Sequence, residues 1–136
     1  MQNDKKYLDL FLKIQEFVES QPKVLVHGDC NSSNIFQKTI IDLDDCNFSP
    51  FGWDFAYALN EYLIRTDSNI LSSLKKVYSF ISDYDFSENE KINISYFYMI
   101  RIQKYLSVKD LEKWIFSLNN KIKSYNNNKV KILKKK

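Results

Sequence analysis

Acidic side chains gather in one short part of this 136-residue sequence. Residues 29–54 carry five carboxylates against a single lysine, which gives the segment a formal charge of −4; the acids are Asp29, Asp42, Asp44, Asp45 and Asp54. Carboxylates packed closely raise one another's pKa unless a cation lies between them. Hard oxygen ligands of this kind suit Mg²⁺. The segment is therefore either a metal site or a solvated acidic loop.

The spacing of the polar residues favours the metal site. His27, Asp29 and Asn34 form a His-x-Asp-x-x-x-x-Asn motif, and Asp42 ends the apolar run that follows. This is the pattern of a phosphotransfer catalytic loop. Such a loop needs one carboxylate to orient the attacking hydroxyl, and it needs an amide oxygen with a second carboxylate to bind Mg²⁺ against nucleotide phosphates. A short loop and a return strand would bring these groups face to face.

Three motifs together resemble the aminoglycoside phosphotransferase and choline kinase-like family, whose members are related to protein kinases. The motifs are His27-Gly28-Asp29 with Asn34-Ile35-Phe36, then Ile41-Asp42-Leu43-Asp44-Asp45, and then Trp53-Asp54-Phe55-Ala56. The Asp-Leu-Asp-Asp run and the helical remainder are most similar to the bacterial stress-response kinase and homoserine-kinase-like branches. The resemblance is strong over residues 23–60, and residues 61–120 are compatible with it.

The resemblance implies a role for each matching residue. Asp29 would be the catalytic base, and Asn34 with Asp42 would bind the metal ion. His27 would brace the catalytic loop, and Asp54 would hold that loop through backbone amides. Contacts to the substrate or to a second metal ion would fall to a further set of residues, namely Asp44, Asp45 and Trp53.

The resemblance also implies a cofactor and partners. The cofactor would be Mg²⁺ with ATP (or GTP), and the partners would be this nucleotide and a small hydroxyl-bearing substrate. We expect a cytoplasmic protein with free thiols at Cys30 and Cys46. No apolar stretch approaches the roughly 20 residues of a membrane span, the N-terminus lacks a signal-peptide pattern, and we expect neither a membrane nor a nucleic acid as a partner.

The elements that must position these residues are mainly helical. Apolar residues at helical spacing predict an amphipathic helix over residues 4–20 and further helices from about residue 53. Short β-branched runs predict a strand at 23–26 and a hairpin between Asn34 and Asp42. We therefore expect an α+β, mainly α fold. In terms of the resemblance, it would be the C-terminal helical lobe of a protein-kinase-like fold with a small β-hairpin carrying the catalytic loop.

Capping residues mark the starts of two helices in the C-terminal half. Ser87 and Glu90 form a capping-box pattern. Ser107 and Asp110 open a last helix, which we expect to end at the three asparagines of residues 126–128.

We expect one kinase-like lobe over residues 1–125, followed by a basic, disordered tail over 126–136. The lobe would contain three parts in order: the catalytic loop at 26–34, the metal-binding loop at 41–45 and a helical subdomain at 53–125. Five lysines in the last eight residues account for the basic tail. Without them the formal net charge of +3 becomes −2, so the body of the protein is mildly acidic.

The residues before the predicted strand lack the parts that bind a nucleotide in kinases. About 22 residues precede the strand and predict one helix, and the chain has two glycines in all, so it has no glycine-rich loop. We therefore expect the nucleotide-binding N-lobe to be absent from this chain, as in a truncated protein, a fragment or a split protein. The lobe would then be supplied in trans, or the apolar face that it leaves exposed would favour self-association.

Three functions remain open. The first is a phosphotransferase lobe with intact catalytic residues, acting on a small molecule or, in the stress-response type, on a protein Ser or Thr; the isolated chain would be inactive without an N-lobe. The second is a non-catalytic, truncated kinase remnant that acts as a binding module. The third is an unrelated metal-binding protein; zinc ligation by His27, Cys30 and Cys46 would lack a fourth Cys or His ligand.

Overall fold

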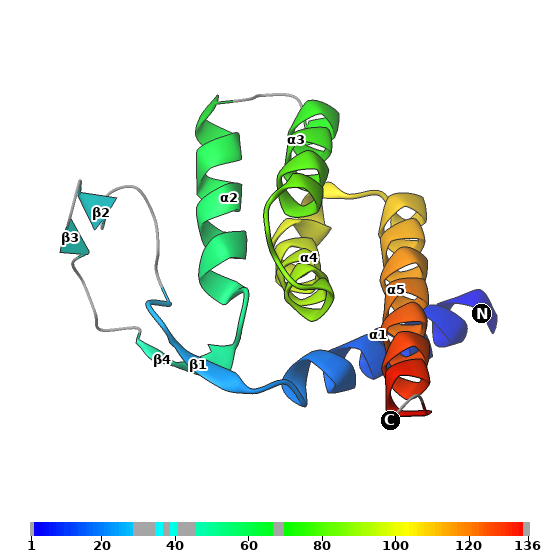
Figure 1. The fold of residues 1–136 in the computed structure, drawn as a ribbon. Helices are drawn as coiled ribbons and strands as arrows, with labels where there is room; N and C mark the ends of the chain where they lie inside the picture. Colours follow the sequence, from blue (N-terminus) through cyan, green and yellow to red (C-terminus); the bar gives the residue numbers. More distant parts are fainter. Residues whose placement is uncertain (1, 29–34, 37–38, 41–45, 67–69, 135–136) are drawn as a thin grey trace.

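Helices make up most of the chain in the computed structural model, which describes residues 2–28, 35–36, 39–40, 46–66 and 70–134. The helices follow one another as α1 (Gln2–Glu19), α2 (Trp53–Thr66), α3 (Ile70–Asp83), α4 (Glu88–Ile102) and α5 (Val108–Lys134), with the short 3₁₀ helix η1 (Gln103–Tyr105) before α5 (Figure 1). The expected α+β, mainly α fold is thereby confirmed. Within the described part of the chain, no helix combines the length and the apolar character that crossing a membrane requires.

Two small antiparallel sheets interrupt the helices. Strands β1 (Lys23–Val26) and β4 (Asn47–Pro50) form the first, and β2 (Ile35–Phe36) and β3 (Thr39–Ile40) form the second. The predicted strand at 23–26 and the predicted hairpin are thus present. The sequence did not predict β4, because Asn-Phe-Ser-Pro contains a single residue that favours strands. It is a strand because its backbone pairs with that of β1.

Helix α4 forms the centre of the molecule, and α1, α2, α3 and α5 all pack against it (Figure 1). Its middle turns are buried all round, which is typical of a central helix; the buried residues are Ile92, Asn93, Ile94, Ser95, Tyr96, Phe97, Tyr98 and Met99. The hydroxyl of Ser95 accepts a hydrogen bond from Trp114 Nε1 of α5 at 2.9 Å. A buried polar group of this kind is stable only when it is paired in this way.

A glycine sets the distance between α2 and α4. Gly52 directly precedes α2 and has a φ of 119°, a backbone conformation that side chains other than hydrogen disfavour. A Cβ atom at this position would lie 3.0 Å from Ile94 N and 3.1 Å from Asn93 C. The absence of a side chain therefore allows the start of α2 to lie directly on the middle of α4.

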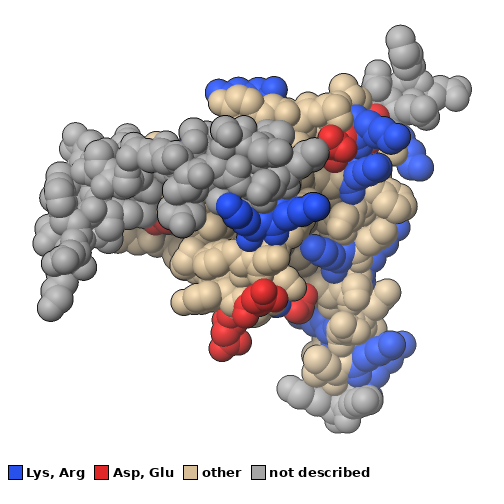
Figure 2. All heavy atoms as spheres, turned by 90° about the horizontal axis from the view of Figure 1, so that it is seen from above, with Lys and Arg blue, Asp and Glu red and all other residues tan. Residues whose placement is uncertain are grey.

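The C-terminal helix is longer than the sequence predicted. Instead of ending at residues 126–128, α5 continues to Lys134, so residues 126–134 are helical and not a disordered tail. Its apolar stripe continues through Tyr125, whose ring packs on that of Phe17 of α1, with the ring centroids 5.7 Å apart. Lysines in the last turn also interact favourably with the helix dipole. Figure 2 shows Lys and Arg side chains on the half of the molecule that holds α5.

Candidate active site

The end of β1 and the first turn of α2 are joined by three hydrogen bonds. The backbone N of His27 donates to Asp54 Oδ2 at 2.8 Å, and the backbone N of Gly28 donates to Asp54 Oδ1 at 3.1 Å. In the opposite direction, Trp53 Nε1 donates to the carbonyl oxygen of Gly28 at 3.2 Å. Two neighbouring residues of α2 thus bind both the N–H and the C=O groups where the predicted catalytic loop begins.

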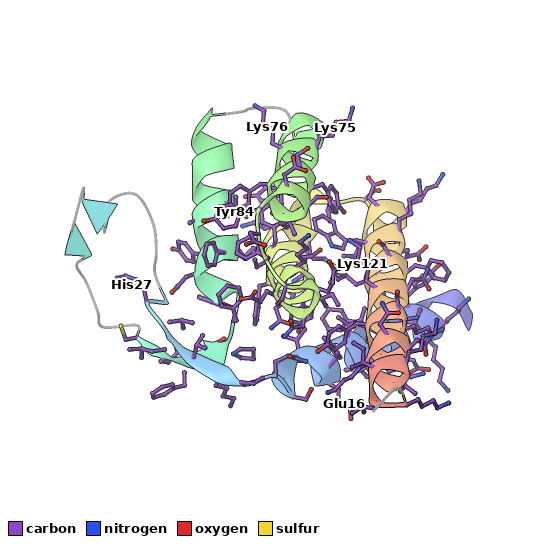
Figure 3. The ribbon with its side chains drawn as sticks, in the orientation of Figure 1. Glu16, His27, Lys75, Lys76, Tyr84 and Lys121 are labelled. Carbon is purple, nitrogen blue, oxygen red and sulfur yellow. The ribbon has the colours of Figure 1, made fainter. Side chains whose placement is uncertain are left out.

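The types of these residues explain the arrangement. One carboxylate has two oxygens and can accept both adjacent N–H groups, and such charge-assisted hydrogen bonds are stronger than neutral ones. Asp54 also lies in the first turn of α2, where the helix dipole favours a negative charge. Gly28 has a φ of 90° and allows the chain to turn directly after β1. His27 directly follows β1 (Figure 3), and its side chain is buried.

An aromatic and cationic cluster extends the site from α2 to α4. The ring of Trp53 packs edge-on against Phe97, with the ring centroids 5.5 Å apart. The guanidinium carbon of Arg101 lies 3.7 Å from the centre of the Tyr57 ring and 5.5 Å from that of Trp53. Arg101 was not among the site residues predicted from the sequence. One signal could have drawn attention to it, since the chain contains only two arginines among its 20 basic residues.

A cavity of about 650 Å³ lies beside these hydrogen bonds. It is formed by the end of α1, strands β1 and β4, the start of α2 and the middle of α4; the lining residues are Val18, Glu19, Lys23, Asn47, Phe48, Ser49, Pro50, Trp53, Tyr96 and Phe97. Of the described residues that line this cavity, Trp53 also donates a hydrogen bond to Gly28. His27, Gly28 and Asp54 do not line it, so the cavity adjoins the candidate active site without being its centre.

The structure brings together three of the residues singled out from the sequence, namely His27, Trp53 and Asp54. The other candidates lie outside the described residues; they are Asp29, Asn34, Asp42, Asp44 and Asp45. Their catalytic and metal-binding roles stay predictions, as do the roles in loop support.

The alternative zinc site has no support in the described part of the chain. Cys46 is exposed, and Cys30 lies outside the described residues. Among the described residues, no three His, Cys, Asp or Glu side chains lie close enough together to bind a metal ion.

Comparison with known proteins places the chain in a family. No curated protein and no solved structure matches it. The sequence profile described as the phosphotransferase enzyme family, however, matches residues 4–88. The matched span runs from α1 to the first residue of α4 and includes the hydrogen-bonded residues His27, Gly28, Trp53 and Asp54. Because this match covers more than half of the 136 residues, the chain belongs to the phosphotransferase enzyme family.

Proposed function

We propose that this chain is the catalytic lobe of an ATP-dependent kinase that transfers a phosphoryl group to a hydroxyl of a small molecule. The observation that carries the proposal is the binding of the His27 and Gly28 amides by the Asp54 carboxylate. These amides directly precede Asp29, the proposed base, in the sequence. A loop held from an adjacent helix supports accurate positioning, which contributes most to phosphoryl transfer.

Asp29 would orient the acceptor. Its carboxylate would accept a hydrogen bond from the acceptor hydroxyl and take the proton as the new O–P bond forms and the bond to the leaving nucleotide breaks. Asp54 would act on this step through the loop backbone, without touching the acceptor. Trp53 would add a second support, because its indole N–H donates to the carbonyl of Gly28.

Asn34 and Asp42 would bind the metal ion. Asn34 directly precedes β2, and Asp42 follows β3 by two positions. Because β2 and β3 are antiparallel, the start of β2 and the end of β3 lie at the same end of the hairpin. One amide and one carboxylate oxygen fit Mg²⁺, which takes few protein ligands when substrate phosphates supply others. When bound, Mg²⁺ with ATP would supply the phosphoryl group and neutralise its negative charge.

The nucleotide would need further binding groups. In the described part of the chain, the single helix α1 precedes β1, and the chain has too few glycines for a glycine-rich loop. Accurate positioning supplies roughly 7–11 kcal/mol of catalysis in well-oriented reactions. We therefore expect residues 1–136 alone to transfer phosphate weakly or not at all, and to transfer it when a nucleotide-binding lobe is added as a separate polypeptide.

The metal site can be tested without an acceptor. Titration calorimetry with Mn²⁺ is expected to show saturable binding to the parent chain and none to Asp42→Asn. Asp85→Asn is the matched control, because Asp85 is an exposed acid in the connection between α3 and α4 and belongs to none of the three motifs. Unchanged Mn²⁺ binding by Asp42→Asn would contradict the metal assignment and favour the non-catalytic binding module.

The transfer step is tested with labelled ATP, an added nucleotide-binding lobe from a family member and a panel of hydroxyl-bearing small molecules. Transfer that Asp29→Asn abolishes is the expected result. Equal transfer by Asp29→Asn, or transfer to protein Ser and Thr residues alone, would overturn the proposed chemistry or the proposed acceptor class, respectively.

A further inference from the structure

Arg101 is a half-buried cation that has no anionic partner in the described part of the chain. Its Nε atom is buried and lacks a hydrogen-bond acceptor there. Among the described residues, no carboxylate forms an ion pair with it. Its neighbours are instead the rings of Tyr57 and Trp53. A partly buried charge is normally paired, and Arg101 lies beside a candidate active site without an ion pair to any described residue.

The guanidinium lies closest to one aromatic neighbour. Its carbon lies 3.7 Å from the centre of the Tyr57 ring, which is the distance of direct stacking. Stacking occupies the face of the planar group and leaves its edge, where the N–H donors lie. The edge of a guanidinium matches the paired oxygens of a carboxylate or a phosphate. The contacts that hold Arg101 therefore leave its anion-binding edge without a described protein partner.

Trp53 connects Arg101 to Gly28, the residue directly before Asp29. Its ring lies 5.5 Å from the guanidinium carbon, and its Nε1 donates to the carbonyl of Gly28 at 3.2 Å. We infer that Arg101 is an anion-binding subsite that recognises a carboxylate or phosphate group on the acceptor. The part that concerns the acceptor rests on the proposed function. The acceptor class is then an anionic hydroxyl compound, such as a hydroxy acid or a sugar phosphate.

The anion site is tested by NMR, independently of any activity. The chain has only two arginines and two tryptophans, so the side-chain signals are few. Sodium phosphate and sodium acetate are titrated separately into the full chain against sodium chloride at equal ionic strength. We expect saturable shifts of the Arg101 Nε–H and Trp53 indole signals, with the Trp114 indole signal unchanged. The stronger of the two salts identifies the anionic group.

Two variants distinguish specific recognition of the anion from a non-specific effect of positive charge. Arg101→Gln is expected to lose the saturable Trp53 shift, and Arg101→Lys, which keeps the charge but not the planar edge, is expected to weaken it about tenfold or more. Lys104→Gln is the control, because Lys104 is an exposed cation in η1, which directly follows α4. Urea unfolding shows which variants are folded, and Arg101→Lys keeps the test valid if Arg101→Gln unfolds.

The outcomes separate this inference from the proposed function. Shifts that are linear and equal in chloride, or a Trp53 shift that persists in Arg101→Gln, would overturn the anion site while leaving Mn²⁺ binding and phosphoryl transfer intact. Saturable anion binding without Mn²⁺ binding or transfer would overturn the proposed kinase and leave the anion site standing. A KM for anionic acceptors that rises in Arg101→Lys, with the KM for neutral acceptors unchanged, would support both.

Discussion

The Asp54 carboxylate lies 2.8 Å from the backbone N of His27, a residue 27 positions earlier in the chain. The contact joins the end of a two-stranded sheet to the first turn of α2. Since the other carboxylate oxygen binds the N–H of Gly28, one side chain fixes two consecutive peptide groups. The direction of the chain as it leaves β1 therefore depends on α2, and α2 in turn is placed by its packing on α4.

Replacing Asp54 with Asn tests this dependence. The amide of Asn has one acceptor oxygen, and its NH₂ group would face a backbone N–H, so one hydrogen bond to a charged group is lost. Such a bond contributes about 1.5–3 kcal/mol, and we expect the free energy of unfolding in urea to fall by about 2 kcal/mol. Asp83→Asn, at an exposed position at the end of α3, is the control. Equal stability of the two variants would show that the pair of bonds is dispensable.

Gly52→Ala is expected to separate α2 from α4. The φ of 119° disfavours a side chain, and the added Cβ would meet the backbone of α4 at 3.0 Å. Backbone strain of this kind costs about 1–3 kcal/mol of folding stability. The contact of the new Cβ with the α4 backbone adds to this cost, because neither helix backbone can move without the other. Urea unfolding measures the loss. Ser117→Ala, a substitution at an exposed position on α5, is expected to keep the free energy of unfolding within about 0.5 kcal/mol of that of the parent. A Gly52→Ala variant as stable as this control would contradict the close approach.

Local sequence signals predicted the parts of the fold that depend on neighbouring residues. The capping box is an example, because Ser87 N donates to Glu90 Oε1 at 2.9 Å and Glu90 N donates to Ser87 Oγ at 3.4 Å, all within one turn. The hairpin of β2 and β3 and the start of α2 at Trp53 are likewise set by short segments. The residues that determine each of these features lie within the same short segment, so a single sequence is enough to predict them.

Features that depend on distant partners were not predictable in this way. Strand β4 exists through its pairing with β1, in which Leu25 lies opposite Phe48, and both side chains are largely exposed. A short strand whose first two residues are exposed leaves no alternation of apolar residues in the sequence. Arg101 was missed for a related reason, since its aromatic neighbours lie on α2, more than forty positions earlier. The length of α5 depends on its packing against α1.

Ser87→Ala is expected to weaken the start of α4. The variant loses the side-chain acceptor for the N–H of Glu90, and loss of a helix N-cap typically costs about 1 kcal/mol. Urea unfolding again gives the change, with Ser82→Ala as the control, because the side chain of Ser82 is exposed and lies outside the cap. Since α4 is the central helix, the whole transition should shift as one. A separate early transition confined to α4 would contradict this.

Two tyrosines with raised pKa values predict how the stability of the protein depends on alkaline pH. Tyr98 is 2% exposed, and burial raises its pKa to about 12 from the usual 10.0. Burial, with the nearby Tyr98, also raises the pKa of Tyr78 to about 12, although that side chain is 42% exposed. Both rings pack against Trp114, with centroid-to-centroid distances of 6.0 Å for Tyr98 and 5.0 Å for Tyr78. Ionisation of Tyr98 would therefore place a charge in the core between α3, α4 and α5.

The sign of the effect follows from the direction of these shifts. Because the folded-state pKa lies above that of the unfolded chain, the folded protein retains the phenol proton more tightly, and this contribution to stability is complete below about pH 10. It is lost as the pH rises from about 10 to about 12, at up to about 1.4 kcal/mol per pH unit for Tyr98. Tyr78 contributes less, because its side chain is 42% exposed and solvent screens its charge. Urea unfolding across this range is expected to show a falling free energy whose slope is smaller in Tyr98→Phe and unchanged in Tyr105→Phe, a matched change at an exposed ring. If Tyr98→Phe kept the full slope of the parent, the alkaline loss of stability would have to arise from a group other than this buried tyrosine.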